Sequence, residues 1–544
     1  MNVSVSLGGR NKRMPFCNGW DRGTCLNMKV CPRPTGPLLR EKLENHLNKG
    51  KQMTAIAGAP LTKITHWKVI DWKIVEDQVK RLQLRIAKAI KTGRFAKAKA
   101  LQWILTHSFS AKLLAIKRVT QNTGRRTPGI DGVIWKTDRQ KMRAVYELKR
   151  KGYKAQPLRR IYIPKKNGKL RGLGIPTMMD RAQQALHLMG LMPISETLAD
   201  ENSYGFRPKR STHDAIAQCF TLLSRKCSPK WVLEGDIKAC FDKIDHNWLS
   251  DNILMDRSIL QQWLKAGYME KNCFYCTEEG TPQGGVASPT LANLALDGLE
   301  KAVKSVGNKG DKINFVRYAD DFICTAYSKE ILLEKVQPVI VEFLKKRGLE
   351  LSLEKTKITH IDEGFDFLGF NVRKYSGKLL IKPSGSSIKK FTESIRETTK
   401  RLGNSVTAKL IAGLNSKIRG WANYYRSCVA KKTFNNIDSV VFESIWGMLK
   451  KKHSYKNIPW IRRKYFTKIG LRSWCFFCNV STKKGVKSYT LIKATDTKIR
   501  RHLKIKGKAN IFDPDFEDYF IERENKRKME RMNSRIVNNN LKRA

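Results

Sequence analysis

An adjacent pair of aspartates, Asp320 and Asp321, sits between two short apolar runs and constrains this chain more than any other feature. Residues 315–326 read Phe-Val-Arg-Tyr-Ala-Asp-Asp-Phe-Ile-Cys-Thr-Ala. This pattern predicts two strands of a hairpin with both carboxylates at its turn. Two neighbouring carboxylates in a mostly apolar setting repel each other and are costly to desolvate. The usual compensation in proteins is a divalent metal ion.

A third carboxylate, Asp236, ends another apolar stretch, Trp231-Val-Leu-Glu-Gly-Asp-Ile237, and can complete such a site. One carboxylate from one strand and two from a hairpin form the constellation of a nucleotide polymerase palm. We therefore expect Asp236, Asp320 and Asp321 to be catalytic and to bind metal, with Ile237 as a further metal ligand. The expected cofactors are two Mg²⁺ ions, which would activate a primer 3′-hydroxyl and stabilise the leaving pyrophosphate.

The excess of basic residues indicates a polyanionic partner. The 544 residues include 106 lysines and arginines against 48 aspartates and glutamates, a formal charge of +58. A charge of this size on a folded protein predicts nucleic acid binding, because each neutralised phosphate releases condensed counterions. A charge that served only solubility would not require so uneven a ratio. The length allows two to four domains, each with its own core.

Several classes of protein are excluded by the composition. No run of about 18 apolar residues occurs, so no membrane span is expected, and the basic N-terminus lacks the apolar segment of a secretory signal. Twelve cysteines are too dilute for a disulfide scaffold, which favours a reducing compartment. The pairs Cys273/Cys276 and Cys475/Cys478 are weak evidence for zinc, and we expect free thiols.

The first half of the chain divides by composition. Residues 1–62 are rich in Gly, Pro, Lys and Arg and predict a poorly ordered basic leader. Helical periodicity then predicts a basic helical extension over residues 63–126. Residues 127–384 are expected to hold fingers and palm. Within them, residues 157–176 predict a hairpin around Asn167-Gly168, whose crowded lysines suit either a nucleotide triphosphate or open solvent.

Local signals also place caps, turns and strands. Asp245 and Ser288 are predicted to cap helices, the latter with Pro289 in the first turn. Residues 281–285, Thr-Pro-Gln-Gly-Gly, form a tight loop that suits close approach of a nucleotide, although glycine turns are common on their own. Residues 365–370 predict a compact aromatic strand against the palm.

Beyond about residue 385 the sequence becomes basic and helical. Apolar residues recur at helical spacing in residues 385–459, with Trp421 and Tyr425 expected in the core and a basic face expected to contact RNA. Residues 460–544 interleave basic and aromatic residues, which is typical of a nucleic-acid surface. The charged end, from Arg523 onward, is expected to fray.

With these blocks in order, the chain resembles a group II intron-encoded protein, the reverse transcriptase and maturase of a mobile self-splicing intron. The resemblance covers most of residues 65–525. It rests on the Tyr-Ala-Asp-Asp box together with Thr-Pro-Gly-Ile-Asp-Gly, Ser-Tyr-Gly-Phe-Arg-Pro, Thr-Pro-Gln-Gly-Gly and Phe-Leu-Gly-Phe. The stretch Leu-Asn-Ser-Lys-Ile-Arg-Gly-Trp-Ala-Asn-Tyr-Tyr-Arg, residues 414–426, looks like the maturase thumb called domain X.

The resemblance implies an α+β, right-hand polymerase with a helical N-terminal extension, a helical maturase thumb and a small basic DNA-binding region. Lys165 and Arg171 would hold the triphosphate of a dNTP substrate, although neighbouring lysines can substitute. Phe241 would lie under the sugar and exclude a 2′-hydroxyl, and Gln283 would line the nucleotide pocket. The expected RNA-binding residues are Lys417, Arg419 and Arg426, and the expected DNA-binding residues are Arg462, Arg463, Lys464, Arg500 and Arg501.

The implied biology is twofold: the protein assists splicing of its own intron RNA, and the lariat complex then invades target DNA, where the intron is copied into cDNA. His502 is the last histidine and no Cys pair follows Cys478, so we expect no H-N-H endonuclease and a primer from elsewhere. The alternatives are a splicing-only maturase and a reverse transcriptase without an intron. A bacterial, nucleoid-associated location is expected over an organelle.

Overall fold

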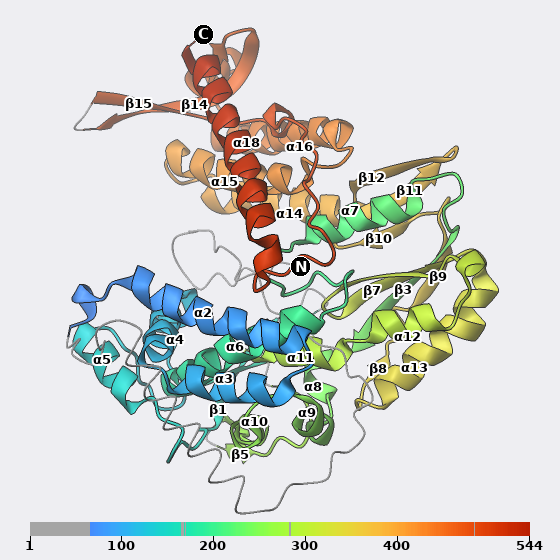
Figure 1. Cartoon of the computed structure of the whole chain (residues 1–544). Coiled ribbons are helices and arrows are strands. Elements are labelled where there is room, and N and C mark those ends of the chain that lie inside the picture. The colour runs from blue at the N-terminus through green and yellow to red at the C-terminus, as the bar shows by residue number, and fades with distance from the viewer. Residues whose placement is uncertain are drawn as a thin grey trace, which may run out of the picture.

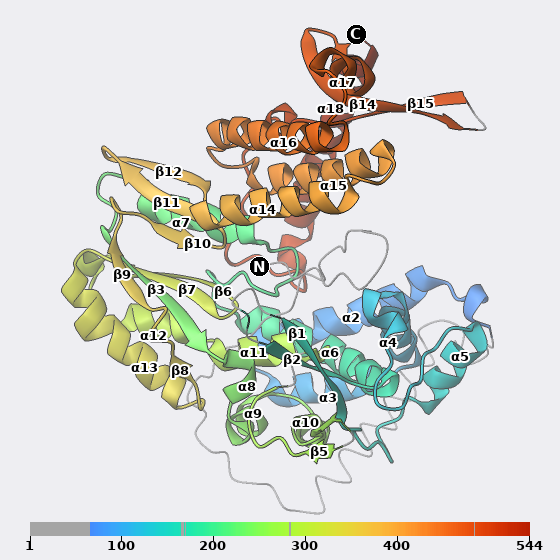
Figure 2. The same cartoon turned by 180° about the vertical axis from the view of Figure 1, so that it is seen from behind.

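The computed structural model describes residues 66–164, 168, 170–271, 273–281, 284–482 and 485–543. The predicted leader, residues 1–62, lies outside them, as do Lys165 and Gln283. Figures 1 and 2 show the blue N-terminal helices in the lower part of the molecule and the orange and red C-terminal elements above them. Over the described residues, helices and mainly antiparallel sheets follow one another, so the predicted α+β class is confirmed.

A layer of N-terminal helices packs on one buried helix, α6. Asp71 begins this layer as a cap, since its Oδ1 accepts the backbone N–H groups of Lys73 at 2.9 Å and Ile74 at 3.3 Å. Helix α6 is buried along nearly its whole length, and polar side chains such as Arg181 and Gln183 donate to backbone carbonyls there. The bounds are α2 (Trp72–Lys91), α3 (Phe95–His107), α4 (Phe109–Gln121), α5 (Asp138–Glu147) and α6 (Met178–Leu198).

The predicted hairpin of residues 157–176 is present. Strands β1 (Leu158–Pro164) and β2 (Leu170–Ile175) pair antiparallel, with Pro164 opposite Leu170. The sheet continues through β4 (Tyr268–Glu270) and β5 (Cys273–Tyr275) in the order β2-β1-β4-β5. In Figure 2, β1 and β2 lie beside α6 in the lower half of the molecule, and β5 lies below them.

The central sheet has the order β6-β7-β3-β8, with β9 also pairing β3. Both of its faces are buried: Val232 belongs to one hydrophobic core and its neighbour Leu233 to the other. The strands are β3 (Trp231–Lys238), β6 (Asn314–Tyr318), β7 (Asp321–Ala326), β8 (Glu350–Leu351) and β9 (Lys357–His360). The helices around it are α7 (Thr212–Leu223), α8 (Cys240–Lys243), α9 (His246–Asn252), α10 (Arg257–Leu264), α11 (Ser288–Leu296), α12 (Leu299–Ser305) and α13 (Gln337–Lys345).

Two helix caps were predicted in this part of the chain, and one of them is wrong. Asp245 caps α9 as predicted, because its Oδ1 accepts the N–H of Trp248 at 2.5 Å. Ser288 is not a cap: it is the first helical residue of α11, the preceding Ala287 occupies the cap position, and no side chain caps the helix. The Ser-Pro pair therefore marks the start of the helix but misplaces its boundary by one residue.

The predicted aromatic strand at residues 365–370 is instead a tight hairpin. Leu368 and Gly369 form its turn at φ +53° and +82°, between β10 (Phe365–Phe367) and β11 (Phe370–Tyr375). The hydroxyls of Tyr424 and Tyr425 each donate to one carbonyl of this turn, at 2.9 Å. These bonds help to hold a leucine in a backbone conformation that it seldom adopts.

Helices α14 (Gly385–Leu402), α15 (Thr407–Tyr425) and α16 (Lys431–Lys452) follow strand β12 (Lys378–Pro383). Their apolar faces join the hairpin in one core, in which Phe391 stacks on Trp421 at a ring distance of 4.7 Å. Tyr425 is 3% exposed, which agrees with its prediction as a core residue. The remaining elements are α17 (Ile458–Tyr465), β13 (Phe466–Ile469), β14 (Arg472–Thr482), β15 (Gly485–Thr490) and α18 (Glu517–Arg543).

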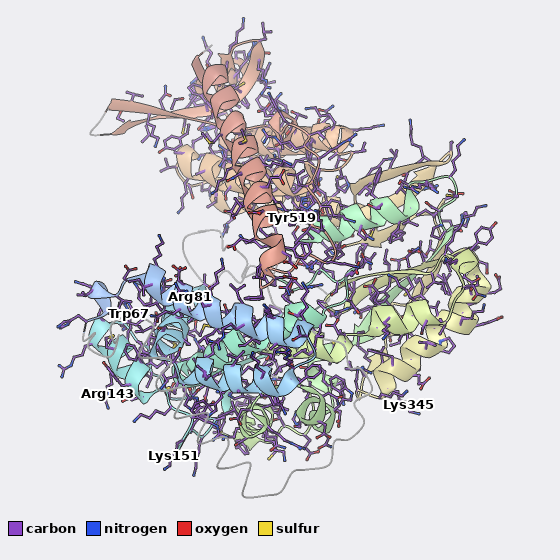
Figure 3. The ribbon with its side chains drawn as sticks, in the orientation of Figure 1. Trp67, Arg81, Arg143, Lys151, Lys345 and Tyr519 are labelled. Atoms are coloured by element: carbon purple, nitrogen blue, oxygen red, sulfur yellow. The ribbon has the colours of Figure 1, made fainter. Side chains whose placement is uncertain are left out.

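After β15 the chain turns back toward the N-terminal helices, and we call residues 500–523 the return segment. Arg210 donates to the carbonyls of Gly507 at 2.9 Å and Ala509 at 3.1 Å. Phe512 packs in a small core with residues of α2 and α6, and Lys91 of α2 pairs with Asp513 at 2.8 Å. Helix α18 then extends from this level toward β14 and β15 (Figure 1), with Tyr519 on its first turns (Figure 3).

The return segment is held to the palm by one buried carboxylate, Asp214 of α7, which is 0% exposed. Its Oδ1 accepts from His502 at 2.8 Å, from the N–H of Ile505 at 2.8 Å and from Arg523 at 3.0 Å. Arg523 is itself 6% exposed, so the prediction that the chain frays from this residue is wrong. A charged residue in this stretch was expected to be solvent-exposed, because nothing near Arg523 in the sequence indicates that Asp214 is its partner.

Burial alone would raise the pKa of Asp214, but the hydrogen bond and charge of His502 and the charge of Arg523 outweigh it. The pKa of this carboxyl therefore lies below its ordinary value. The stability that it contributes is present above its unfolded pKa of about 3.9 and is lost as the pH falls through the folded pKa.

None of the helices among the described residues is both long enough and apolar enough to cross a lipid bilayer.

Substituting Asp214→Ala should lower the free energy of unfolding by about 3–5 kcal/mol, because it leaves Arg523 and His502 buried without their acceptor. Denaturant unfolding measures this change, and hydrogen exchange should show faster opening of residues 500–523.

Glu524→Ala is the matched control, since Glu524 also ties α18 to the palm through Lys209 at 3.2 Å, but both side chains are about half exposed. It should leave unfolding nearly unchanged. Equal losses in the two variants would contradict a special role for the buried carboxylate.

Candidate active site

Three aspartates meet at one end of the central sheet. Asp236 of β3 lies directly opposite Asp321 of β7 in antiparallel register, and Asp321 also pairs with Tyr318 of β6. Asp320 occupies the turn between β6 and β7, and we call residues 318–321 the carboxylate turn. All three aspartates are half-buried. The sheet register thus brings together the three residues that the sequence singled out.

The carboxylates are held where their charges are costly. Burial raises the pKa of Asp321 to about 7, and the charges of Asp320 and Asp236 add to this effect. Burial likewise raises the pKa of Asp320, with a contribution from the charge of Asp236. Three like charges in a partly dehydrated corner are favourable only when a positive charge offsets them.

Lys355 supplies one such charge, and sequence reasoning missed it. Its Nζ lies 2.6 Å from Oδ2 of Asp236, and this bond raises the pKa of the ammonium. The backbone N–H of Ser352 donates to the Asp236 carbonyl at 2.8 Å, which places the segment carrying Lys355 beside the site. No local pattern marks Lys355 among its neighbours; only the pairing of β8 and β9 with β3 brings it here.

The residues at this corner fit a divalent cation by their chemistry. Carboxylate oxygens are the ligands that Mg²⁺ prefers, and two of the three have raised pKa values that a nearby cation would lower. Over the described parts of the chain, no group of three or more His, Cys, Asp and Glu side chains stands ready to hold an ion. One oxygen of Asp236 is bound by Lys355 instead.

Described segments next to the expected nucleotide-binding residues contact one another. The N–H of Thr281 donates to the carbonyl of Phe241 at 2.6 Å. Gly284, at φ +117°, packs against β2 so closely that a Cβ would lie 2.6 Å from the carbonyl oxygen of Gly174, so only glycine fits. The charge of Arg171 in β2 acts to lower the pKa of Asp320, which shows that this guanidinium is within electrostatic reach of the site. Phe241 is half-buried.

Three protein families match consecutive parts of the chain. Residues 67–148 match the N-terminal domain of reverse transcriptase, residues 163–372 match reverse transcriptase (RNA-dependent DNA polymerase), and residues 388–466 match the maturase-specific domain of group II introns. Protein YkfC of Escherichia coli is 36% identical over 310 residues, which are 48% of this chain and 80% of YkfC. The chain belongs to the group II intron reverse transcriptase–maturase family.

Other relatives agree. The group II intron-encoded protein LtrA of Lactococcus lactis is 29% identical over 409 residues, covering 57% of this chain and 68% of LtrA. A solved structure of telomerase from Candida albicans, in complex with a fragment of telomeric RNA, covers 57% of this chain and 64% of its own with 12% identity. Its TM-score of 0.32 is too low to inform the fold. The protein is thus an RNA-directed DNA polymerase, whose nucleotidyl transfer requires dNTPs and a divalent metal ion.

The expected RNA-binding residues of the maturase thumb differ in accessibility. Arg419 is exposed on α15. Lys417 is half-buried, its ammonium donates to the carbonyl of Ser394 in α14 at 3.1 Å, and burial lowers its pKa. Arg426 is also half-buried, and its carbonyl accepts from the N–H of Arg500 at 2.9 Å. Arg419 is therefore the member of this set that best reports on a surface.

The expected DNA-binding residues of the reverse transcriptase lie in two places. Arg462, Arg463 and Lys464 are exposed on α17, beside the C-terminal sheet, where Arg462 lies 4.8 Å from the ring centre of Trp474. Arg500 and the exposed Arg501 instead begin the return segment, next to α15 and α7.

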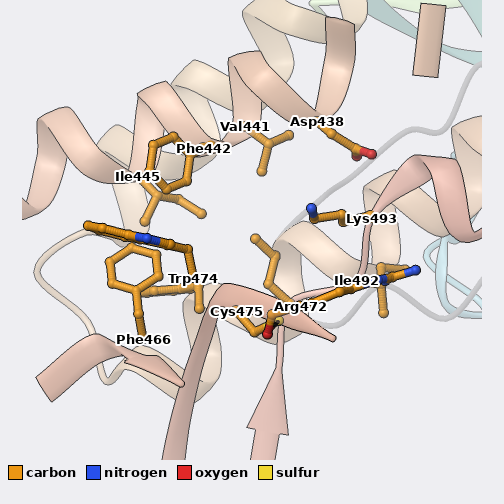
Figure 4. Close-up of a pocket in the computed structure, with 12 residues that line it drawn as sticks. Asp438, Val441, Phe442, Ile445, Phe466, Arg472, Trp474, Cys475, Ile492 and Lys493 are labelled. Carbon is orange, nitrogen blue, oxygen red and sulfur yellow. Dashed lines mark hydrogen bonds between the residues drawn. The ribbon is translucent and has the colours of Figure 1, made fainter. Parts of the chain in front are cut away.

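A small hollow between α16 and the C-terminal sheet is separate from the aspartates. Phe442, Trp474 and Phe466 lie toward one end of it, and Asp438 and Lys493 lie at the other (Figure 4). Its volume of about 60 Å³ has room for about two waters. We interpret it as a packing gap, because most of the side chains that line it are apolar.

Lys355→Met should destabilise the metal-free protein by no more than about 1 kcal/mol, because the lysine is 65% exposed and solvent screens the pair. Added Mg²⁺ should then raise the unfolding temperature of the variant more than that of wild type, since the ammonium no longer competes for Asp236.

Lys357→Met is the control, an exposed lysine two residues away in β9. If both variants respond to Mg²⁺ as wild type does, the ammonium does not compete with the cation.

Proposed function

We propose that Asp236, Asp320 and Asp321 are the catalytic residues of this reverse transcriptase and hold two Mg²⁺ ions. The observation that carries the proposal is the register of Asp236 opposite Asp321, with Asp320 at the adjoining turn. Ile237 would contribute its backbone carbonyl, because its side chain has no donor atom. Bound there, the metal ions supply the Lewis-acid chemistry that activates a 3′-hydroxyl and stabilises pyrophosphate.

The other residues of the site bind and orient the nucleotide. Arg171, whose charge acts on Asp320, would hold the triphosphate together with Lys165. Phe241 excludes a 2′-hydroxyl by its bulk and so selects deoxynucleotides, and Gln283 lines the pocket. The bond between the Thr281 N–H and the Phe241 backbone carbonyl supports this arrangement, because it holds the chain at Thr281 against the residue proposed to lie under the sugar.

We further propose that the protein binds its own intron RNA, assists splicing and copies the intron into cDNA at a DNA target. The maturase-specific match and the relationship to LtrA support intron binding, and the excess of positive charge supports contact with both nucleic acids. The proposed parts are fingers and palm in residues 127–384, the maturase thumb in 385–459 and the DNA-binding region in 460–544. The lariat ribonucleoprotein would act at the bacterial nucleoid.

Asp321→Ala should lower primer extension on an RNA template at least about 1,000-fold, equivalent to about 4 kcal/mol of barrier. Intron RNA binding should stay within about twofold of wild type, because the basic surfaces are unchanged. Asp251→Ala, which removes an exposed carboxylate of α9, is the control and should extend normally.

Extension by Asp321→Ala at the wild-type rate would exclude these carboxylates as the active site. Failure of wild type itself to extend, with tight RNA binding retained, would favour a maturase that acts only in splicing.

Arg419→Ala should weaken intron RNA binding and reduce the slope of log affinity against log salt by about 0.7–0.9, the value for one phosphate contact. Lys345→Ala on α13 removes the same charge from the palm and serves as the control. Equal salt slopes for wild type and Arg419→Ala would show that this face of α15 does not contact the RNA.

A further inference from the structure

Arg317 is a fully buried cation directly before the carboxylate turn. It lies in β6 at 0% exposure, and one end of its guanidinium donates to the carbonyl of Ala319 at 3.0 Å. Ala319 has a φ of +60°, a backbone conformation that residues other than glycine seldom adopt. The next two residues are Asp320 and Asp321. The guanidinium therefore bonds the peptide group that directly precedes the two carboxylate-bearing residues.

The other donors of Arg317 fix it from three sides. Nη1 also donates to Oδ1 of Asn293 at 3.1 Å, and Nη2 donates to the hydroxyl of Ser203 at 2.9 Å and to Asp297 at 3.1 Å. Asp297 is 1% exposed and forms the ion pair that makes the buried charge tolerable. A planar guanidinium can meet these acceptors together, whereas an ammonium acts as a point charge and cannot.

The loop of residues 203–205 lies against the same turn. A Cβ on Gly205 would be 2.2 Å from the N of Ala319, so only glycine allows this contact. The carbonyl of Gly205 accepts from Asn293 at 3.0 Å, and the N–H of Tyr204 donates to the Arg317 carbonyl at 2.9 Å. The Ser-Tyr-Gly segment, residues 203–205, has no role in the polymerase chemistry described above. Its contacts instead support the backbone of the carboxylate turn.

We propose that Arg317 is a positioning residue for the carboxylate turn. Its bond to the Ala319 carbonyl sets the backbone that presents Asp320 and Asp321, and Asn293, Asp297 and Ser203 hold the guanidinium in the one orientation that makes this bond. The inference rests on the proposed catalytic role of those aspartates. Displacement of reacting groups by about 1 Å lowers enzymatic rates by about 100-fold, so such support carries a large effect.

Arg207 provides a matched comparison within the same protein. It is also buried, at 2% exposure, is paired with Glu196 at 2.9 Å and donates to the Ser203 carbonyl at 3.0 Å. Its bonds to Glu196, Asp200 and Ser203 do not include the carboxylate turn. A general effect of weakening a buried arginine should be of similar size in both variants, and an effect on the aspartates should be much larger in the Arg317 variant.

The test compares Arg317→Lys with Arg207→Lys in the full-length chain by two measurements. The first is single-nucleotide incorporation on an RNA template at varied Mg²⁺ and dNTP. The second, without substrate, is the shift in unfolding temperature that Mg²⁺ alone produces. Arg317→Lys should slow incorporation by about 10- to 100-fold, raise the Mg²⁺ concentration for half-maximal rate and diminish the Mg²⁺-induced shift, with little change in the KM for dNTP. Arg207→Lys should lower the unfolding temperature and change both Mg²⁺ responses much less, because Arg207 bonds the supporting segment at Ser203 whereas Arg317 bonds the turn itself.

Unchanged Mg²⁺ responses in Arg317→Lys, or equal changes in the two variants, would overturn the proposal. Should Arg317→Lys fail to fold, Ser203→Ala removes only one acceptor and should raise the Mg²⁺ requirement in the same direction; a wild-type requirement would then overturn it. Asp321→Ala, measured in parallel, distinguishes failure of the positioning role of Arg317 from failure of the catalytic role of the aspartates. If it is inactive while Arg317→Lys behaves as wild type, only the positioning role fails; if it is active, the catalytic assignment fails as well.

Discussion

Three carboxylates must share one corner of the central sheet, and the surrounding structure is arranged to make that possible. Each charge is partly removed from water and close to two others, so the metal-free site is electrostatically unfavourable. A flexible loop would separate the carboxylates. Here β3 and β7 are buried on both faces, and the register of Asp236 opposite Asp321 is fixed by two hydrophobic cores.

Two positive side chains lie near the aspartates, and they differ in burial: Lys355 is mostly exposed and Arg317 is fully buried. Lys355 is mostly exposed and bonds a carboxylate directly, so it can give way when another cation binds. Arg317 is fully buried, bonds the backbone beside the aspartates and is itself paired with Asp297, so it cannot move without leaving charges unpaired. The first balances charge at the site and the second fixes geometry. A positive side chain near the aspartates therefore has a different effect when it is exposed than when it is buried.

The sequence allowed prediction of those features that depend on neighbouring residues. The hairpin that carries Asp320 and Asp321, the hairpin around Asn167-Gly168 and the helical spacing within residues 385–459 follow from local sequence patterns. The structure has strands at both hairpins and a helix, α15, in the last of these ranges. The partner of Lys355 lies 119 residues away, and nothing near Lys355 indicates it. Leu368 adopts a positive φ because tyrosine hydroxyls from α15 bond its turn, which no local preference of leucine predicts. Arg523 looked like part of a solvated tail for the same reason: the carboxylate that buries it belongs to the palm.

The contact between Asp214 and Arg523 also affects when the chain can complete its folding during synthesis. The two residues are separated by 309 positions, so the loop that this contact closes is long and its formation is slow compared with that of local helices. During synthesis at about 5–20 residues per second, the carboxylate of α7 waits roughly 15–60 s for its partner to leave the ribosome. Over that interval Asp214 of α7 lacks the positive charge of Arg523, although its position is buried in the folded protein. The nascent protein thus reaches its final core only after Arg523 has been synthesised.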